Sequence, residues 1–243
     1  MKLQPFWFAL QFLTRFPVPA RVAYDPVVAG RSLLAYPAVG LLIGVLLAVV
    51  HGLSDAAPPA VSAALILLTW VLSTGALHLD GLADCADAWV GGHGSRERTL
   101  QILKDPHAGS VAVAVTVTVL LAKFAALQSL PAQSGAVETL LWAPAAGRAA
   151  ALILLSASPY ANPEGIAGAW LGHLPVPPAR IVALAVAIAV AWRLGLPALL
   201  AAGLVLWGIR RLSMARLGGV TGDVCGAAVE LVEMAVLLAA AVR

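Results

Sequence analysis

The sequence predicts an all-α, polytopic transmembrane helical bundle of about seven spans, and three observations lead to this class. Of the 243 residues, 61% are apolar and only 11% are charged, whereas soluble domains carry roughly 25% charged residues. The apolar residues are gathered into blocks, and about 20 of them suffice to cross the hydrocarbon layer. Inside lipid only helices and closed barrels satisfy their backbone hydrogen bonds, so blocks of this length indicate helices.

The first element that we expect is a helix lying in the membrane interface, within the stretch MKLQPFWFALQFLTRFPVPA. Pro5 and Arg15 interrupt its apolar run, so a removable signal peptide is not expected. Aromatic side chains favour the headgroup boundary, and those of this stretch are Phe6, Trp7, Phe8, Phe12 and Phe16.

The membrane spans follow in chain order. Apolar blocks occupy residues 33–50, 60–79, 109–130, 136–157, 180–209 and 224–242. Gly195 and Pro197 interrupt the block at 180–209, which is therefore one long bent span or two short ones. No internal repeat or separate soluble part is evident, so we expect a single integral-membrane domain over residues 1–243.

The basic residues predict the orientation, because cytoplasmic loops are enriched in Lys and Arg. Connections 51–59 and 131–135 hold neither residue type. The basic segments hold Lys2, Arg15, Arg21, Arg31, Arg96, Arg98, Lys104, Arg180, Arg210, Arg211 and Arg216. All of them share one side only if 180–209 crosses twice, which predicts seven spans, a cytoplasmic N-terminus and an external C-terminus. The net charge of +3 is then a topology signal and predicts no nucleic-acid partner.

Acidic residues mark a candidate active site at the cytoplasmic face. In HLDGLADCADAW (78–89), Asp80, Asp84 and Asp87 fall at i, i+4 and i+7, which lie within one narrow arc of a helix. Carboxylates that converge in this way repel one another, and oxygen ligands together with substrate phosphates suit Mg²⁺. The alternative is that three solvated acids simply end a helix.

A second acidic segment favours the functional interpretation. In TGDVCGAAVELVE (221–233), Asp223, Glu230 and Glu233 lie in an apolar span, where an ionisable residue is a functional hypothesis by default. Gly222 and Gly226, with the alanines that follow, would permit close helix packing. We therefore hypothesise that the two helices pack together, with their acids converging on one cation site.

Basic residues near the acids suggest phosphate binding. Arg96, Arg98 and Lys104 follow the aspartates, and Arg can form two bonds to phosphate oxygens. The alternative for Arg96 and Arg98 is a role in topology alone. Arg148 lies mid-span and needs a partner, whereas Lys123 could simply snorkel to an interface and is given no role.

Cysteine and histidine residues near the acids are interpreted as structural. Sulfur is a poor ligand among hard oxygens, and a reducing cytosol disfavours a disulfide, so Cys85 and Cys225 are expected to be packing residues. A lone histidine is more often structural than functional, and this applies to His78, His93 and His107.

Taken together, these segments resemble the cobalamin synthase family over nearly the whole chain. The matching stretches are FLTRFPVP (12–19), YPAVGLLIG (36–44), HLDGLADCADAW (78–89), RERTLQILKDPHAGS (96–110), Arg148, EGIAGAW (164–170) and TGDVCGAAVELVE (221–233). The family usually has Met where Leu103 stands and often Arg where His107 stands.

The resemblance implies a phosphoryl-type transferase of the bacterial cytoplasmic (inner) membrane that acts in vitamin B12 synthesis. A hydroxyl of α-ribazole, or of its 5′-phosphate, would attack the phosphorus on the cobinamide side of adenosylcobinamide-GDP. GMP would leave, and adenosylcobalamin or its phosphate would form. Mg²⁺ is the implied cofactor, the two substrates and the lipid bilayer are the expected partners, and a homo-oligomer is left open.

The matching positions carry the expected roles. The metal ligands are Asp80, Asp84, Asp87 and Asp223, and the last three of these are also assigned to catalysis. Substrate binding is assigned to Arg96, Arg98, Lys104, Asp105, Arg148 and Glu230.

Two other functions are compatible with intramembrane acids. A CDP-alcohol-type phosphotransferase uses the pattern DGxxAR followed by GxxxDxxxD, but DGLADCAD (80–87) lacks the arginine and the later spacing. A cation transporter would carry its acids near mid-membrane on several helices, without the basic cluster that follows Asp87 here.

Overall fold

The computed structural model describes residues 3–19, 22–130, 135–162 and 167–242, and every regular element within them is helical. The all-helical class predicted from the sequence is therefore confirmed. The elements are α1 (Gln4–Leu13), α2 (Pro26–Ser32), the 3₁₀ helix η1 (Leu33–Ala35), α3 (Tyr36–Leu53), α4 (Pro59–Thr74), α5 (Leu77–Gly91), α6 (Arg96–Ile102), α7 (Ser110–Ser129), α8 (Ala136–Ala157), α9 (Gly168–Leu171), α10 (Val176–Leu217) and α11 (Gly222–Ala241).

Long apolar helices dominate the architecture. Those able to cross a membrane by length and composition are Pro26–Leu53, Ser110–Ser129, Ala136–Ala157, Val176–Leu217 and Gly222–Ala241. Helices α4 and α5 pass the same test only as a pair, and they are bent by 88° relative to each other. The structure thus has five candidate spans, or six if the bent pair counts as one.

The break between α4 and α5 corrects the sequence-based boundary of the 60–79 block. Helix α4 ends at Thr74, because Gly75 takes the left-handed conformation with φ of 61°. Ala76 follows at φ of 59°, a region that non-glycine residues seldom occupy. The chain therefore turns sharply before Leu77, and the aspartate-bearing helix α5 leaves the direction of the span that precedes it.

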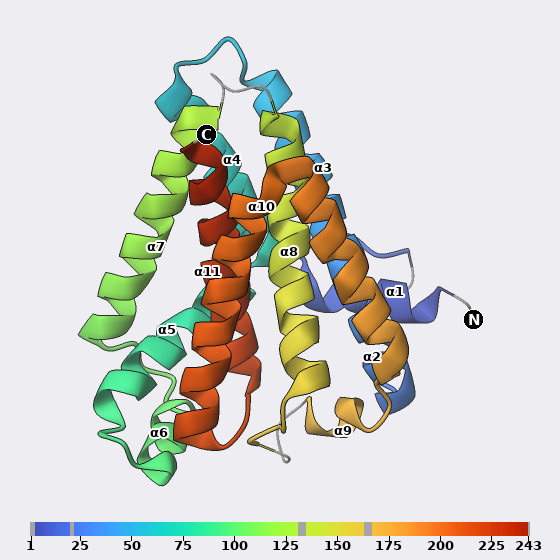
Figure 1. Ribbon diagram of the computed structural model, residues 1–243, viewed down its shortest axis with the longest axis vertical. Coiled ribbons are helices and arrows are strands. Elements are labelled where there is room, and N and C mark those ends of the chain that lie inside the picture. Colours follow the sequence, from blue (N-terminus) through green and yellow to red (C-terminus); the bar gives the residue numbers. More distant parts are fainter. Residues whose placement is uncertain (1–2, 20–21, 131–134, 163–166, 243) are drawn as a thin grey trace.

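Helix α10 also changes direction. Gly195 has φ of 75° and ψ of 173°, which no α-helix accommodates, and Pro197 follows two residues later. On either side of this break the two arms of α10 run in opposite directions and diverge from the bend, with α8 between them (Figure 1). Residues from both arms, among them Val186 and Leu206, line one small cavity with α8.

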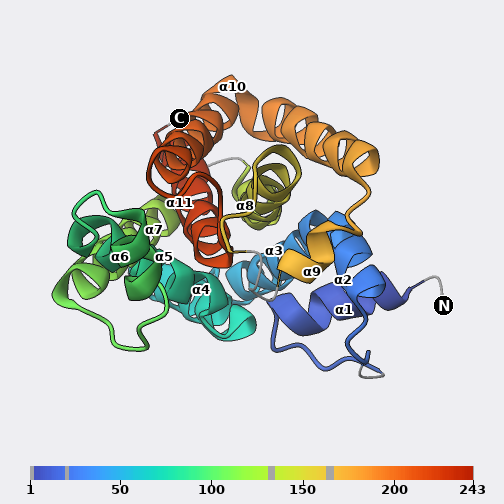
Figure 2. The same cartoon turned by 90° about the horizontal axis from the view of Figure 1, so that it is seen from below.

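Helix α8 lies at the centre of the bundle, surrounded by α3, α10 and α11 (Figure 2). Its middle section, from Ala143 to Leu152, is buried at every position. Alanine and glycine supply most of this section, so neighbouring backbones approach closely, as small residues allow in membrane helices.

The N-terminal helix forms where the sequence predicts one, and part of its aromatic set packs against the rest of the protein. Helix α1 forms at Gln4–Leu13, but Phe8 is buried and its ring meets Trp170 edge-on at 5.7 Å between centroids. Phe12 meets the same indole at 5.1 Å and stacks on Tyr36 at 6.5 Å. Phe8 and Phe12 therefore pack α1 against α9, and Phe12 also packs it against α3.

The elements sort into two ends of the bundle. Helices α5, α6 and α9 and the turn between α10 and α11 lie at one end (Figure 1). The connection between α3 and α4, the bend of α10 and the C-terminal end of α11 lie at the other. The aspartates of α5, the basic residues of α6 and the start of α11 are thus at the same end of the bundle.

Candidate active site

The candidate site forms where α5 crosses the start of α11. Gly81 on α5 touches the backbone of α11, since a β-carbon there would lie 2.8 Å from the carbonyl oxygen of Asp223. Gly226 on α11 faces α5 in turn, where a β-carbon would lie 3.2 Å from the carbonyl oxygen of His78. The helix pairing predicted from the sequence is confirmed, and glycine on both partners permits it.

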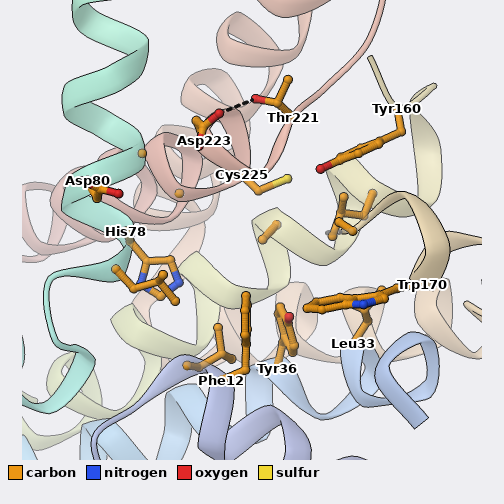
Figure 3. A pocket seen from close by; sticks show the side chains of 18 of the residues that line it. Phe12, Leu33, Tyr36, His78, Asp80, Tyr160, Trp170, Thr221, Asp223 and Cys225 are labelled. Atoms are coloured by element: carbon orange, nitrogen blue, oxygen red, sulfur yellow. Dashed lines mark hydrogen bonds between the residues drawn. The ribbon is translucent and has the colours of Figure 1, made fainter. Parts of the chain in front are cut away.

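This crossing brings aspartates from the two helices together. Asp80 and Asp223 line the same cavity and lie on neighbouring elements in Figure 3. Asp84 is half-buried and experiences the negative charges of Asp80, Asp223 and Asp87. In the part of the chain that the structure describes, none of these four carboxylates forms an ion pair.

Asp87 differs from the other aspartates in its hydrogen-bond partners. Its carboxylate accepts hydrogen bonds from the backbone N–H of Gly109 at 2.5 Å and of Ala112 at 2.9 Å. These amides belong to the N-cap residue and the first turn of α7, where the leading N–H groups have no partner within the helix. Asp87 thus caps α7 from a distance in sequence, a role that its i+7 spacing could not reveal.

A cavity of about 290 Å³ adjoins Asp80 and Asp223. Its far side carries the rings of Phe12, Tyr36 and Trp170, which come from α1, α3 and α9 (Figure 3). The remaining aromatic and polar lining includes His78, Tyr160, Asn162 and Thr221.

Tyr160 reaches the cavity because the chain after α8 is tied to the turn before α11. Ala161 N–H donates to the carbonyl of Val220 at 2.8 Å, and Val220 N–H donates to that of Pro159 at 2.9 Å. Burial raises the pKa of Tyr160 to about 12, so its hydroxyl stays protonated at neutral pH. Sequence reasoning missed Tyr160 and the aromatic wall, although Phe12, Tyr36 and Trp170 each lie in a segment that carries the family resemblance.

The other acids of α11 belong to a separate, buried cluster. Lys123 Nζ on α7 lies 2.5 Å from Glu230 Oε2 and 2.6 Å from Glu233 Oε2. Arg148 on α8 pairs with the second oxygen of Glu233. Lys123 therefore does not snorkel to an interface: its side chain is 3% exposed and packs over the Trp70 ring. Two basic and two acidic groups balance, which removes the need for an added cation.

This cluster changes the interpretation of two predicted substrate-binding residues. Arg148 finds the intramembrane partner that it was expected to need, but the partner is Glu233 rather than substrate. Glu230 was expected to converge with Asp223, yet it lies two turns further along α11, paired with Lys123. Neither residue lines the cavity beside Asp80. Because Glu230 and Glu233 are both paired with basic side chains, neither provides a free carboxylate for a transported cation.

The predicted basic loop residues are placed differently from one another. Arg96 donates to the carbonyls of Leu217 at 2.9 Å and Ala161 at 3.4 Å, which ties α6 to the end of α10. Arg98 and Lys104 are exposed. Asp105 accepts a hydrogen bond from the ring of His107, and this bond lowers the pKa of Asp105. Asp105 and Asp87 line the same open hollow of about 400 Å³.

The donor set is suited to a hard cation, but the carboxylates are not gathered into a closed site. Within residues 3–19, 22–130, 135–162 and 167–242, no three His, Cys, Asp or Glu side chains are close enough to share one metal ion. Mg²⁺ usually binds through one or two carboxylates and completes its shell with water and substrate phosphates. Asp80, Asp84 and Asp223 fit this use, because they are oxygen donors with an unbalanced charge. Cys85 and Cys225 are free and buried, as expected of packing residues.

Comparisons with known proteins agree with the resemblance read from the motifs. The model of the cobalamin-5-phosphate synthase family matches residues 5–241. A relative from Pseudomonas putida (strain W619), named adenosylcobinamide-GDP ribazoletransferase, is 50% identical over 96% of this chain and 97% of its own length. Relatives of the same name from Pseudomonas syringae pv. syringae (strain B728a) and Pseudomonas entomophila (strain L48) are 50% and 51% identical over the same shares. No solved structure matches the chain. With nearly its whole length matched by the family model and by relatives at half identity, the chain belongs to the cobalamin-5-phosphate synthase family.

Proposed function

We propose that the chain transfers the cobinamide phosphate of adenosylcobinamide-GDP to α-ribazole or to its 5′-phosphate, the final step of cobalamin synthesis. The observation that carries the proposal is the meeting of Asp80, Asp84 and Asp223 beside a cavity, with no basic partner among the described residues. Unbalanced carboxylates of this kind are suited to binding a cation and the phosphates that it neutralises. The names of the relatives supply the substrates.

The reaction requires one P–O bond to form and another to break. The acceptor hydroxyl attacks the phosphorus on the cobinamide side, the bond to the GMP oxygen breaks, and the hydroxyl proton passes to a base. Asp80 and Asp223 line the cavity and can accept this proton, provided that the hydroxyl lies within hydrogen-bond reach. Breaking a pyrophosphate depends mainly on positioning and on balancing oxygen charges.

Mg²⁺ is the proposed cofactor. Bound by one or two carboxylates, it would neutralise the pyrophosphate oxygens. The proposed ligands are one or two carboxylates from the set of Asp80, Asp84 and Asp223, whereas Asp87 has both of its oxygens engaged by backbone amides. The proposed general base is one of Asp80 and Asp223, and Asp84 would act through the metal.

The exposed basic residues are proposed to bind the nucleotide phosphates. Arg98 and Lys104 are exposed, Arg98 donating only to the exposed Gln101 side chain at 3.4 Å, and Asp105 lies near them on the loop that follows α6. Arg96, Arg148 and Glu230 are held by bonds within the protein, so we assign them a positioning role.

We further propose that the bundle lies in the bacterial cytoplasmic (inner) membrane with seven spans. This number follows if α10 crosses twice and if α4 counts as a crossing. The end that carries α5 and α6 would face the cytoplasm, because Arg96, Arg98 and Lys104 lie there while 51–59 holds no Lys or Arg. The charged corrinoid nucleotide would then reach the aspartates from the cytoplasm.

Turnover of the purified protein tests the proposal. With adenosylcobinamide-GDP, α-ribazole and Mg²⁺, the wild type should release GMP and form adenosylcobalamin. Asp80→Asn keeps the shape of an exposed side chain but removes its charge, and should lower kcat by about 100-fold.

Asp55→Asn is the matched control, since Asp55 is also exposed but belongs to the connection between α3 and α4 at the other end of the bundle. It should leave kcat within about twofold. Absence of GMP release by the wild type, or equal losses in the two variants, would refute the proposal.

A further inference from the structure

The cavity beside Asp80 and Asp223 has walls that are mostly apolar, and the proposed reaction does not by itself explain them. Apart from the aromatic wall, Leu155 and Ala151 of α8 face into it. At about 290 Å³ it lies near the lower end of the size range of small-molecule pockets, roughly 300–1,000 Å³. A corrin macrocycle is far larger than this space, so the cavity suits one flat ring system and a sugar.

Two buried polar groups in the walls have no partner. Nδ1 of His78 and Nε1 of Trp170 lack a hydrogen bond among the residues that the structure describes. The two residues are 6% and 3% exposed, and both line the cavity. Buried polar atoms are nearly always satisfied in folded proteins, but these two nitrogens are themselves covered by neighbouring atoms, so the argument for a ligand rests on the shape and the chemistry of the exposed walls.

The geometry points to this cavity as the site of the acceptor nucleoside, with its base against Phe12, Tyr36 and Trp170 and its sugar toward Asp80 and Asp223. The inference rests on the proposed function and assigns the cavity to one of the two substrates. The aromatic rings and the aspartates lie on different sides of the cavity (Figure 3). A base held by the rings therefore directs its sugar hydroxyl to the carboxylates that would accept the proton.

The chemistry of the walls favours the base of α-ribazole over the guanine of the donor. A dimethylbenzimidazole has an apolar edge and one free ring nitrogen, which a single donor such as the Tyr160 hydroxyl at the cavity wall can satisfy. Guanine carries an amide and an exocyclic amine along its edge, and burying these without partners is unfavourable. Of the polar side chains of the lining, Tyr160, Asn162 and Thr221 come from the two tied segments beside Asp223, whereas Leu155 and Ala151 offer no donor or acceptor for such an edge.

Two neighbouring alanines of α8 allow a matched test. Ala151 faces this cavity and is 4% exposed, whereas Ala150 faces the smaller cavity between α8 and α10 and is 3% exposed. Ala151→Leu fills the proposed nucleoside site, and Ala150→Leu places the same bulk on the same helix outside it. We expect Ala151→Leu to raise the KM for α-ribazole at least tenfold while the KM for adenosylcobinamide-GDP changes less than twofold. Ala150→Leu should change neither constant by more than twofold.

A second pair avoids the packed core in case Ala151→Leu fails to fold. Phe12 is 39% exposed, so Phe12→Ala can remove part of the wall with little risk to the fold, and Phe6→Ala is its control on α1. Phe12→Ala should raise the KM for α-ribazole about fivefold. Titration of the wild type with α-ribazole alone and with GMP alone should give a signal for α-ribazole that Phe12→Ala weakens, while GMP binding is unchanged.

The outcomes separate this inference from the proposed function. A rise in the KM for adenosylcobinamide-GDP alone would place the donor in the cavity, and an unchanged KM for both substrates in Ala151→Leu and Phe12→Ala would leave the cavity without a role. Either result overturns the inference while wild-type turnover upholds the reaction. Absence of wild-type turnover would instead refute the proposed function.

Discussion

Asp87 illustrates how one carboxylate of a regular series can serve a purpose that its neighbours do not share. Asp80 and Asp84 carry charges that no described basic side chain balances, whereas Asp87 receives two backbone N–H bonds from the start of α7. A β-carbon on Gly109 would lie 2.9 Å from both carboxylate oxygens of Asp87, so this cap also depends on a glycine. The contact joins α5 to α7 and thereby helps to hold the aspartate helix in place.

Loss of this cap should lower the stability of the fold while leaving the Mg²⁺ requirement largely unchanged. We expect Asp87→Ala to lower the free energy of unfolding by about 1–2 kcal/mol, the range for loss of a helix cap. Thermal unfolding in detergent measures the change, and Asp55→Ala provides an exposed aspartate as the control. An unchanged melting temperature together with a raised Mg²⁺ requirement would contradict the structural role and restore Asp87 as a metal ligand.

At the scale of the elements, the crossing of α5 and α11 determines whether the site exists. Gly81 meets the backbone of Asp223 so closely that no side chain fits without separating the helices. Separation would draw Asp80 and Asp84 away from Asp223, because these aspartates are fixed to the two helices on either side of the contact.

Gly81→Ala should therefore abolish most activity, because a small displacement of α5 relative to α11 would move the aspartates out of position. We expect kcat to fall at least about 100-fold, in line with the sensitivity of catalysis to misplacement of about 1 Å. Gly208→Ala on α10 is the control, since nothing lies within 4 Å of a β-carbon at that position. It should be neutral or slightly stabilising.

Turnover and thermal unfolding measured on the same two variants separate misplacement from unfolding. If Gly81→Ala keeps wild-type turnover, then the close contact between α5 and α11 is not what positions the aspartates.

At the scale of the whole molecule, the arrangement of charge predicts which end faces the cytoplasm. Ser95 is exposed between α5 and α6, and Asp55 is exposed between α3 and α4. Leu196 is 64% exposed beside the bend of α10. The proposed seven-span topology places Ser95 inside the cell and the other two positions outside it.

Cysteine labelling tests this topology. Ser95→Cys should react with a membrane-impermeant thiol reagent only after the cells are opened, whereas Asp55→Cys and Leu196→Cys should react in intact cells. The native Cys85 and Cys225 are buried, so the wild type serves as the blank. Labelling of Ser95→Cys in intact cells would reverse the orientation, and protection of Leu196→Cys in both states would argue against a double crossing by α10.

The sequence by itself determined the class of the protein and the identity of its central motif. Apolar blocks of bilayer length specify membrane helices because no other local structure satisfies the backbone in lipid. The spacing of Asp80 and Asp84 and the small residues around Gly226 indicated two helices that meet with acids between them, and the structure places α5 against α11. These features are local, since each depends on residues within a few helical turns.

Only the tertiary structure decided which acids work together and what surrounds them. Helical periodicity predicts that Asp223 and Glu230 share a face of α11. It does not predict that α5 packs against Asp223 while Lys123 of α7 pairs with Glu230. It likewise could not show that Asp87 caps α7 or that Phe12, Tyr36 and Trp170 form one wall. The physical reason is that periodicity specifies the direction of a side chain from its own helix, while its partner is set by the packing of segments that lie far away in the chain.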